Sequence, residues 1–332
     1  MNKRLLDEIE RAIQQLKLPS DPRSLYDPFQ YTMDMGGKRI RPYLTLLASG
    51  IASGQHNNAM HAALAIEILH NFTLVHDDIM DEAETRRGFP CVHNKWDPNV
   101  AILSGDVMYV YAFQQLLHYG KKINIGQEAY HAMMEVFVQA TIKVCDGQAL
   151  DMELMQRKKV EVEQYVEMIE GKTGALLSAA LGLGVIVGGR LDLLANMQEL
   201  GRLMGVAFQM QDDLLDVTAE PENFGKKKAG DILEGKKTYL WIRTYEQCTN
   251  DEQALMDLAY KGPKELLDHA WVSSVTEFMY KYQVIDEISQ LINNKYAQIY
   301  DIIKEFEHPE YRNELHQLID YLTGRNRTHT VS

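Results

Sequence analysis

The chain has 332 residues, of which 45% are hydrophobic and 24% charged, and its formal net charge is −13 at pH 7. A chain of this length and apolar content can bury one large core, so we expect a single domain over residues 1–332. The strong negative charge argues against nucleic-acid binding as the main activity, and local basic clusters are therefore expected to bind something small.

Helical periodicity extends over almost the whole chain. Residues 2–18 are predicted to form an amphipathic helix that ends at a proline-rich loop. Further helices are predicted for residues 43–55, 58–81, 99–118, 126–156, 161–188 and 191–217, and the part that follows Tyr239 shows the same pattern. Strand signals are nearly absent. The predicted fold is all-α, a single bundle of roughly ten or more helices with functional side chains on inward faces.

The ends of the chain and its most apolar run bear on location. The N-terminal residues are amphipathic and charged throughout, unlike a signal peptide. Residues 174–189 are too few for a membrane span and rich in glycine, so we predict a closely packed buried helix and no stable membrane insertion. Three widely spaced cysteines, Cys91, Cys145 and Cys248, indicate reduced thiols and a cytoplasmic location. The last ~8 residues are expected to be disordered.

A first aspartate motif lies at the end of the helix predicted for residues 58–81. Asp77 and Asp81 stand at i and i+4, so their carboxylates leave one helix face, with Asp78 beside them. Such a face beneath an apolar run needs a compensating cation, and hard oxygen ligands with room for water and phosphate suit Mg²⁺ better than zinc. Taken alone, the motif is equally compatible with a solvated acidic turn.

A second aspartate motif repeats the spacing in QMQDDLLD, with Asp212, Asp213 and Asp216. Two such faces opposed across a cavity would hold a cluster of cations, and a cation cluster attracts a polyanion such as diphosphate. Lysines and arginines near both motifs supply the remaining countercharge of a phosphate site, namely Arg86, Arg87, Lys226 and Lys236.

Three further stretches carry polar groups that this chemistry can use. In GGKRIRP, a glycine pair precedes Lys38, Arg39 and Arg41, which fits an anion-binding loop, although a basic surface loop is the commoner explanation. Lys172 and Thr173 interrupt an apolar helix; Thr173 alone is best read as a hydrogen-bonded core residue, whereas buried lysines are rare unless paired. The lysine-rich stretch 223–238 contains glycines and is suited to close over phosphate.

Together and in this order, the two DDxxD motifs, GGKRIRP, RRG and FGKKKAGDILEGKKT resemble the trans-prenyl diphosphate synthases, from about Tyr31 to Tyr239. The resemblance implies an all-α fold, usually homodimeric, with a central cavity and the two aspartate motifs facing each other across its mouth. It also implies Mg²⁺-dependent head-to-tail condensation of isopentenyl diphosphate with dimethylallyl, geranyl or farnesyl diphosphate. The product would be a short all-trans prenyl diphosphate.

The resemblance also assigns roles, position by position. It makes Asp77, Asp81 and Asp212 the principal Mg²⁺ ligands, with Asp78, Asp213 and Asp216 supporting them directly or through water. It places the allylic diphosphate on Arg86, Lys172, Lys226 and Lys236. It places isopentenyl diphosphate on Lys38, Arg41, His70 and Arg87. It sets Thr173 and Gln209 beside the allylic cation. The sequence departs from the family at Phe89, where a cation is common, and at Lys227 and Lys228, which replace a proline-containing stretch.

Product length is suggested by the helix that precedes the first motif. Phe72 lies five residues before Asp77, about 7 Å along the axis, and the small Thr73 lies four before. In the family, two aromatic residues at these positions resemble farnesyl producers. One aromatic at the fifth position, a small residue at the fourth and no insertion in the motif resemble geranylgeranyl producers. The sequence therefore favours a C20 product, with C15 next.

Three other functions remain open at this point. A terpene cyclase shares the helical fold, but it would normally replace the second motif by an asparagine, serine and glutamate pattern and needs no second diphosphate site. A non-catalytic partner subunit of a synthase should have lost carboxylates, and none is missing here. A purely structural helical protein is the third alternative.

Overall fold

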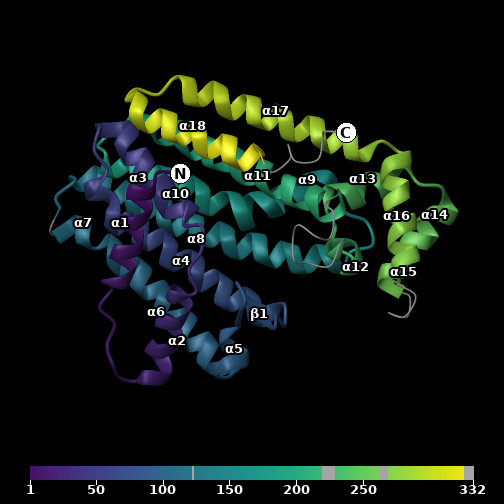
Figure 1. The fold of residues 1–332 in the computed structure, drawn as a ribbon, viewed down its shortest axis with the longest axis horizontal. Helices are drawn as coiled ribbons and strands as arrows, with labels where there is room; N and C mark the ends of the chain where they lie inside the picture. The colour runs from purple at the N-terminus through teal and green to yellow at the C-terminus, as the bar shows by residue number, and fades with distance from the viewer. Residues whose placement is uncertain (122, 219–228, 262–267, 325–332) are drawn as a thin grey trace. The chain divides into compact units, whose positions relative to one another are not determined.

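The computed structural model describes residues 1–121, 123–218, 229–261 and 268–324. Its regular structure is almost entirely helical (Figure 1), which confirms the all-α prediction. The chain divides into two compact units. The first is made of Met1–Ala140, Leu176–Gly201 and Ile303–Leu318, and the second of Thr141–Ala175, Arg202–Ile302 and Ile319–Ser332. The predicted phosphate ligand Lys226, its neighbours Lys227 and Lys228, and the tail expected to be disordered lie outside the described residues.

The first unit begins with eight helical segments. They are α1 (Lys3–Gln14), α2 (Arg23–Asp34), α3 (Ile40–Ser53), η1 (Asn57–Ala59), α4 (Met60–Met80), α5 (Val92–Lys95), α6 (Pro98–Leu116) and α7 (His118–Lys121). The sequence predicted a loop where α2 lies, because three prolines fall between residues 19 and 28. Pro28 is inside α2, where it removes one backbone hydrogen bond without ending the helix.

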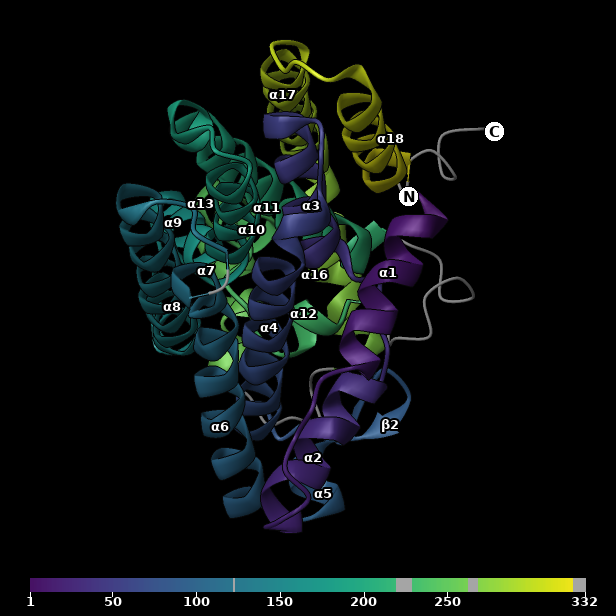
Figure 2. The same ribbon diagram turned by 90° about the vertical axis from the view of Figure 1, so that its left-hand side faces the viewer.

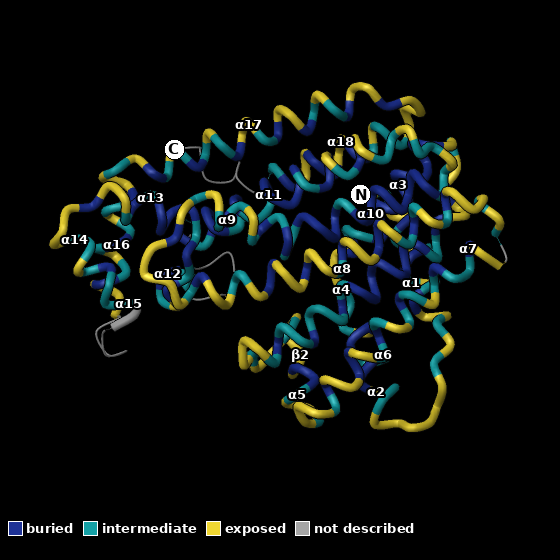
Figure 3. The backbone as a smooth tube through the Cα atoms, turned by 180° about the vertical axis from the view of Figure 1, so that it is seen from behind, coloured by how far each residue is buried: buried dark blue, intermediate teal, exposed yellow. Residues whose placement is uncertain are grey.

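Helix α4 is the centre of the first unit. It packs most extensively against α6 and next against α3, and Figure 2 shows it beside α6. Helices α3 and α4 are buried along most of their length (Figure 3). This burial explains why the apolar residues of α4 cover nearly every face, and it fixes the position of the aspartates at its end.

Helix α10 (Ala175–Val187) is the predicted closely packed apolar helix. A Cβ atom on Gly184 would lie 2.4 Å from the carbonyl oxygen of Thr45, so only glycine allows α10 to approach α3 this closely. The first unit also contains η3 (Leu191–Leu193), the start of α11 (Leu194–Thr218), and parts of α8 (Gln127–Gln156), α17 (Val284–Lys304) and α18 (Pro309–Gly324).

The second unit contains the remaining parts of α8, α11, α17 and α18 together with shorter elements. These are α9 (Val162–Ile169), the π-helix η2 (Glu170–Gly174), α12 (Gly230–Leu233), α13 (Tyr239–Gln247), α14 (Asn250–Met256), α15 (Leu258–Lys261) and α16 (His269–Lys281). Every third or fourth residue of α17 is buried between Val284 and Ile303, as expected for an amphipathic helix.

Two stretches are long and apolar enough, by length and composition alone, to cross a membrane. In Val162–Val187, 83% of the apolar window is buried inside the protein, as in the core helix of a folded domain. In Pro98–Lys121 the buried share is 33%, because α6 exposes several large apolar side chains.

Candidate active site

The first motif lies at the C-terminal end of α4, as predicted. Asp77 and Asp78 belong to the last turn, and Asp81 is the C-cap, whose backbone N–H donates to the carbonyl oxygen of Asp77 at 2.8 Å. The middle residue, Asp78, is only 4% exposed and accepts a hydrogen bond from Nε of Arg86 at 2.9 Å. Asp77 is half-buried and Asp81 exposed. The two outer carboxylates are therefore the accessible ones.

A two-residue hairpin carries the arginines that follow this motif. Strand β1 (Thr85–Arg86) pairs antiparallel with β2 (Phe89–Pro90), and the turn residues Arg87 and Gly88 both have positive φ angles of 54° and 82°. Positive φ at both positions is the backbone of a tight hairpin turn. The hairpin directs Arg86 to Asp78 and Arg87 to the carbonyl oxygen of Gly36. Sequence analysis did not predict this hairpin, since its strands have two residues each.

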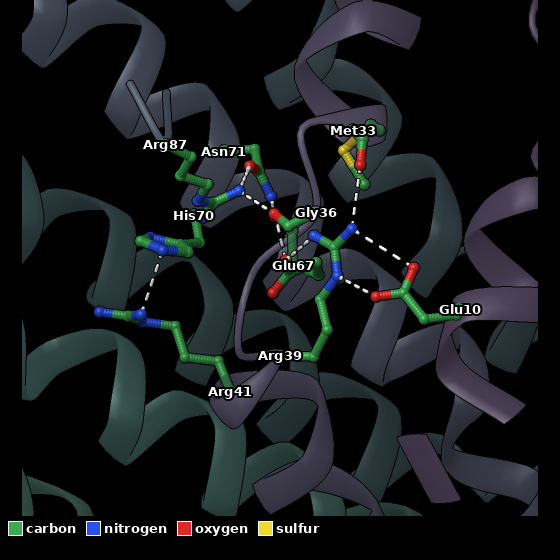
Figure 4. A network of polar contacts seen from close by, with 9 residues as sticks. All are labelled: Glu10, Met33, Gly36, Arg39, Arg41, Glu67, His70, Asn71 and Arg87. Atoms are coloured by element: carbon green, nitrogen blue, oxygen red, sulfur yellow. Dashed lines mark hydrogen bonds and ion pairs between the residues drawn. The ribbon is translucent and has the colours of Figure 1, made fainter. Parts of the chain in front are cut away.

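A cation cluster, defined here as Arg41, His70 and Arg87, lies in the same unit (Figure 4). Arg41 Nη1 lies 3.1 Å from Nε2 of His70, and Arg87 Nη1 lies 3.5 Å from Oδ1 of Asn71. The buried Nε of Arg41 has no hydrogen-bond partner among the described residues. Lys38 lies exposed in the loop that precedes α3. The cluster thus contains a buried donor that a bound anion would satisfy.

The titration of the cluster follows from the same geometry. Burial lowers the pKa of Arg41 to about 10, and Arg87 adds to this effect while Glu67 opposes it. Burial, and then Arg41 and Arg87, hold the pKa of His70 well below its usual value. A neutral His70 accepts from Arg41 through Nε2, which leaves its Nδ1–H as a donor.

Arg39, the middle cation of GGKRIRP, is not part of this cluster. Its guanidinium lies between Glu10 and Glu67 (Figure 4), at 2.7 Å from Oε1 of Glu10 and 2.6 Å from Oε1 of Glu67. It also donates to the carbonyl oxygen of Met33 at 2.9 Å. Sequence analysis grouped the three cations of this loop; in the structure Arg39 has a left-handed backbone and links α1 to α4 through its ion pairs with Glu10 and Glu67.

The second motif lies on α11 in the second unit. Its middle residue, Asp213, is 4% exposed, and it accepts hydrogen bonds from the Tyr165 hydroxyl at 2.6 Å and from Nε2 of Gln209 at 2.9 Å. Asp216 accepts from the backbone N–H of Asp231 at 3.0 Å. Asp212 and Asp216 are half-buried. As in the first motif, the outer carboxylates are more accessible than the middle one.

Burial and a neighbouring carboxylate raise the pKa values of two aspartates in the second motif. Burial raises the pKa of Asp213 to about 7, with a further contribution from Asp231, against the hydrogen bonds of Tyr165 and Gln209. Burial and Asp231 also raise the pKa of Asp216. Carboxylates that raise one another's pKa are stabilised by a cation placed among them.

A cavity of about 100 Å³ adjoins the second motif within this unit, and its wall includes Asp213, Asp231, Lys172, Lys236, Thr173 and Gln209. Lys172 donates to Asp151 at 2.6 Å, and Lys236 lies 3.0 Å from Asp231 and 2.9 Å from Glu234. Burial lowers the pKa of Lys236, but Asp231 and Glu234 outweigh it and raise the pKa overall. Tyr165 and Asp231 were not singled out from the sequence, and no spacing in the sequence pointed to them.

Lys172 and Thr173 are presented by the π-helix η2. A Cβ on Gly147 would lie 2.2 Å from the backbone nitrogen of Lys172, and one on Gly171 would lie 2.7 Å from the carbonyl oxygen of Lys143. The two glycines therefore let α8 and η2 cross in backbone contact. A π-helix inside an otherwise α-helical stretch commonly marks a functional site.

An aromatic column lies below the first motif. Phe72 contacts His76 at 4.8 Å and Tyr109 at 5.8 Å between ring centroids, and Tyr109 stacks on Phe137 at 6.3 Å. Thr73 uses its hydroxyl to donate to the carbonyl oxygen of His70 at 2.8 Å. The sequence singled out Phe72 and Thr73 but not Tyr109 and Phe137, which come from other helices.

The family profile of polyprenyl synthetase matches residues 22–279. The chain belongs to the polyprenyl synthetase family. Over 271 residues, this polyprenyl synthetase is 40% identical to a geranylgeranyl diphosphate synthase of Methanosarcina mazei, covering 81% of each chain. It is 34% identical over 266 residues to a geranylfarnesyl diphosphate synthase of Natronomonas pharaonis, covering 75% of this chain and 77% of that one. The crystal structure of a geranylgeranyl pyrophosphate synthetase from Pyrococcus horikoshii matches with a TM-score of 0.86 at 33% identity, covering 96% and 94%.

Membership makes the protein a prenyltransferase that forms a short-chain trans-prenyl diphosphate by condensation of isoprenoid diphosphates. The family generally uses a divalent metal ion. The donor set fits such an ion, because Asp231 raises the pKa of both Asp213 and Asp216, so a cation placed among these carboxylates would stabilise them. Among the described residues, no three acidic, histidine or cysteine side chains converge on one point.

Proposed function

We propose that this polyprenyl synthetase uses Mg²⁺ to join isopentenyl diphosphate to dimethylallyl, geranyl or farnesyl diphosphate, with geranylgeranyl diphosphate (C20) as main product and a C15 product next. The cation cluster carries the proposal, because its buried Arg41 Nε suits a diphosphate bound without metal. A terpene cyclase has no use for a second diphosphate site. A non-catalytic partner subunit has no reason to keep all six carboxylates of the two motifs.

The proposed metal ligands are Asp77, Asp81 and Asp212, with Asp78, Asp213 and Asp216 in support. When bound, divalent ions neutralise charge on the departing diphosphate, which lowers the barrier to ionisation. Arg86, Lys172 and Lys236 are proposed to hold the allylic diphosphate. The two lysines now pair with Asp151 and Asp231, with side chains 28% and 39% exposed, so they can reorient toward phosphate.

Isopentenyl diphosphate is proposed to bind Lys38, Arg41, His70 and Arg87. His70 and Asp77 are seven residues apart on α4, about 10 Å along its axis, which suits two diphosphates whose carbon chains must meet. The oxygens of Thr173 and Gln209 are proposed to stabilise the allylic cation. The alkene then attacks this cation, and the adduct loses a proton to the released diphosphate.

Product analysis by mass spectrometry tests this proposal. Purified protein is incubated with Mg²⁺, isopentenyl diphosphate and each of the three allylic starters. A C20 product supports the whole proposal. A C15 product or one longer than C20 supports the same chemistry, but it places the floor of the tail pocket, the pocket that holds the growing prenyl chain, at another depth. Absence of condensation with every starter, in protein shown to be folded, would favour the partner subunit or the cyclase.

The aromatic column supplies the floor of the tail pocket in this proposal. We predict that Phe72→Ala lengthens the main product by at least one C5 unit, because it removes the first ring of the column. Phe113→Ala removes a ring that lies 6.2 Å from Phe137 at the lower end of the column; it serves as control and should leave the C20 product. An unchanged product from Phe72→Ala would show that the floor lies elsewhere.

Two neighbouring arginines test the isopentenyl site. We predict that Arg41→Met raises KM for isopentenyl diphosphate about 100-fold, the effect of a lost charge-assisted anion contact, and leaves KM for the allylic substrate unchanged. Arg39→Met is the matched control, since Arg39 is held by Glu10 and Glu67. It should lower the free energy of unfolding by about 3 kcal/mol, as for a broken buried ion pair, without changing either KM. Equal effects of the two substitutions on KM would refute the assignment.

A homodimer is also part of the proposal. On α6, Leu103 and Val110 are each 59% exposed and stand seven residues apart, so they share one face. Ile102 and, on α8, Val138 are also exposed. An apolar face of this kind is expected to be buried against a second copy of the chain. Light scattering after gel filtration tests this, and Leu103→Glu should yield monomers.

We further propose a cytoplasmic enzyme, given the buried thiols of Cys91 and Cys248.

A further inference from the structure

Four side chains in the second unit form one continuous hydrogen-bond chain. Tyr165 from α9 and Gln209 from α11 both bond to Asp213, at 2.6 Å and 2.9 Å, and Thr173 from η2 bonds to Oε1 of Gln209 at 3.1 Å. All four line the same cavity. Tyr165 is 1% exposed and Asp213 4%, so water does not compete for the bond between them.

The bond directions follow from the chemistry of each group. In its ionised form Asp213 only accepts, so Tyr165 donates its hydroxyl proton to Oδ2 of Asp213 and the Gln209 amide turns its nitrogen to Oδ1. The amide oxygen of Gln209 then faces Thr173 and accepts its hydroxyl proton. Because Thr173 donates its hydroxyl proton to Gln209, the lone pairs of Oγ1 are available to a ligand. Reversal of the Gln209 amide would bring N–H donors where an oxygen now lies.

Both oxygens of Asp213 are occupied by these two donors. The first motif shows the same arrangement, since its middle residue Asp78 is also 4% exposed and is held by Arg86. In each motif the outer aspartates are the more accessible ones. The middle aspartate is therefore engaged by the protein itself in both motifs.

On the basis of the proposed function, we propose that Tyr165 and Asp213 are positioning residues that hold the oxygens of Gln209 and Thr173 toward the allylic cation, and that Asp213 does so without binding a metal ion directly. An oxygen dipole aimed at a developing positive charge lowers the barrier only if it is oriented before the reaction. Tyr165 contributes by fixing Oδ2, which prevents Asp213 from rotating away from Gln209.

The test compares Tyr165→Phe with Tyr245→Phe at saturating substrates and pH 8. Tyr245 is a matched control in the same unit, since its hydroxyl donates to Asp257 at 3.0 Å outside the cavity wall. We expect Tyr165→Phe to lower kcat about tenfold while KM for both substrates and the Mg²⁺ concentration for half-maximal rate stay within about twofold. Tyr245→Phe should leave all of these values unchanged. Thermal unfolding confirms that both variants are folded.

A double variant tests whether Tyr165 acts through Gln209. If it does, Tyr165→Phe combined with Gln209→Leu is no slower than Gln209→Leu alone, since residues that act as a unit are not additive. Multiplied effects would overturn the proposal. So would a Tyr165→Phe variant that needs several times more Mg²⁺, which would make Asp213 a metal ligand, or one that behaves like Tyr245→Phe. Failure of the wild type to condense any starter would instead refute the proposed function.

Discussion

In the first motif the buried carboxylate of Asp78 is held by the guanidinium of Arg86, whereas in the second motif Asp213 is held by a phenol and an amide, Tyr165 and Gln209. The spacing and burial of the two aspartates are alike, but only Asp78 has a cationic partner. Asp213 instead has a carboxylate neighbour, Asp231, that raises its pKa. The middle aspartates of two motifs with one sequence pattern therefore differ in their charged neighbours: Asp78 is paired with a cation, and Asp213 lies near a carboxylate.

The largest expected effect comes from the outer aspartates. We predict that Asp77→Asn and Asp212→Asn each lower kcat by about 10³-fold or more, since each removes a proposed metal ligand. Glu84→Gln, an exposed neighbour of the first motif, should have no effect.

The comparison adds a second readout, the melting temperature without metal. Asp216→Asn should raise it, because it relieves repulsion in the second motif, and Asp77→Asn should not. Equal shifts would contradict the difference in charged neighbours.

A smaller effect is expected from the partners of the middle aspartates. Arg86→Gln should lower the free energy of unfolding by about 2 kcal/mol, because it leaves the buried Asp78 without its charged donor. Tyr165→Phe removes a neutral donor and should cost about 1 kcal/mol. Urea unfolding of the metal-free protein measures both. If Tyr165→Phe proves the more costly, the first motif is not the one that relies on a charged partner.

The last expected effect is a pH dependence of the metal-free protein, which is gradual over several pH units. Folded Asp213 keeps its proton up to a pH of about 7, while the unfolded chain releases it near pH 4. Between these values the folded state binds more protons, so the free energy of unfolding falls as pH rises, by at most about 1.4 kcal/mol per pH unit, and the decline ends above pH 7. Asp213→Asn should show a shallower decline in urea unfolding across this window. Identical slopes would show that Asp213 is ionised throughout.

The sequence predicted what depends on local spacing. Asp77 and Asp81 leave one end of α4 because a helix repeats every 3.6 residues, and the apolar run at residues 174–189 is the buried helix that its composition indicated. Arg41 lies 3.1 Å from His70, and the charge of Arg87 lowers the pKa of both. The proposed roles of these residues stay predictions until the variants are measured.

The sequence did not predict partners that are set by tertiary packing. Tyr165 lies 48 residues from Asp213, and no periodicity relates them. Arg39 and Arg41 are alike in sequence, but Arg39 pairs with Glu67, whereas Arg41 lies against His70. The π-helix at Lys172 lies where Gly147 and Gly171 let two backbones touch, a contact that local propensity does not predict. In each case the feature that was not predicted is a contact between residues that are far apart in the sequence.

The hairpin turn at Arg87 and Gly88 constrains insertions more than substitutions. Its two strands have two residues each, and the turn between them fixes the register that sends Arg86 to Asp78 and Arg87 to the Gly36 loop. One additional residue would shift this register and reverse the faces to which the side chains point. Natural variants of the chain are therefore expected to change side chains around this turn while the number of residues between the first motif and Pro90 stays constant.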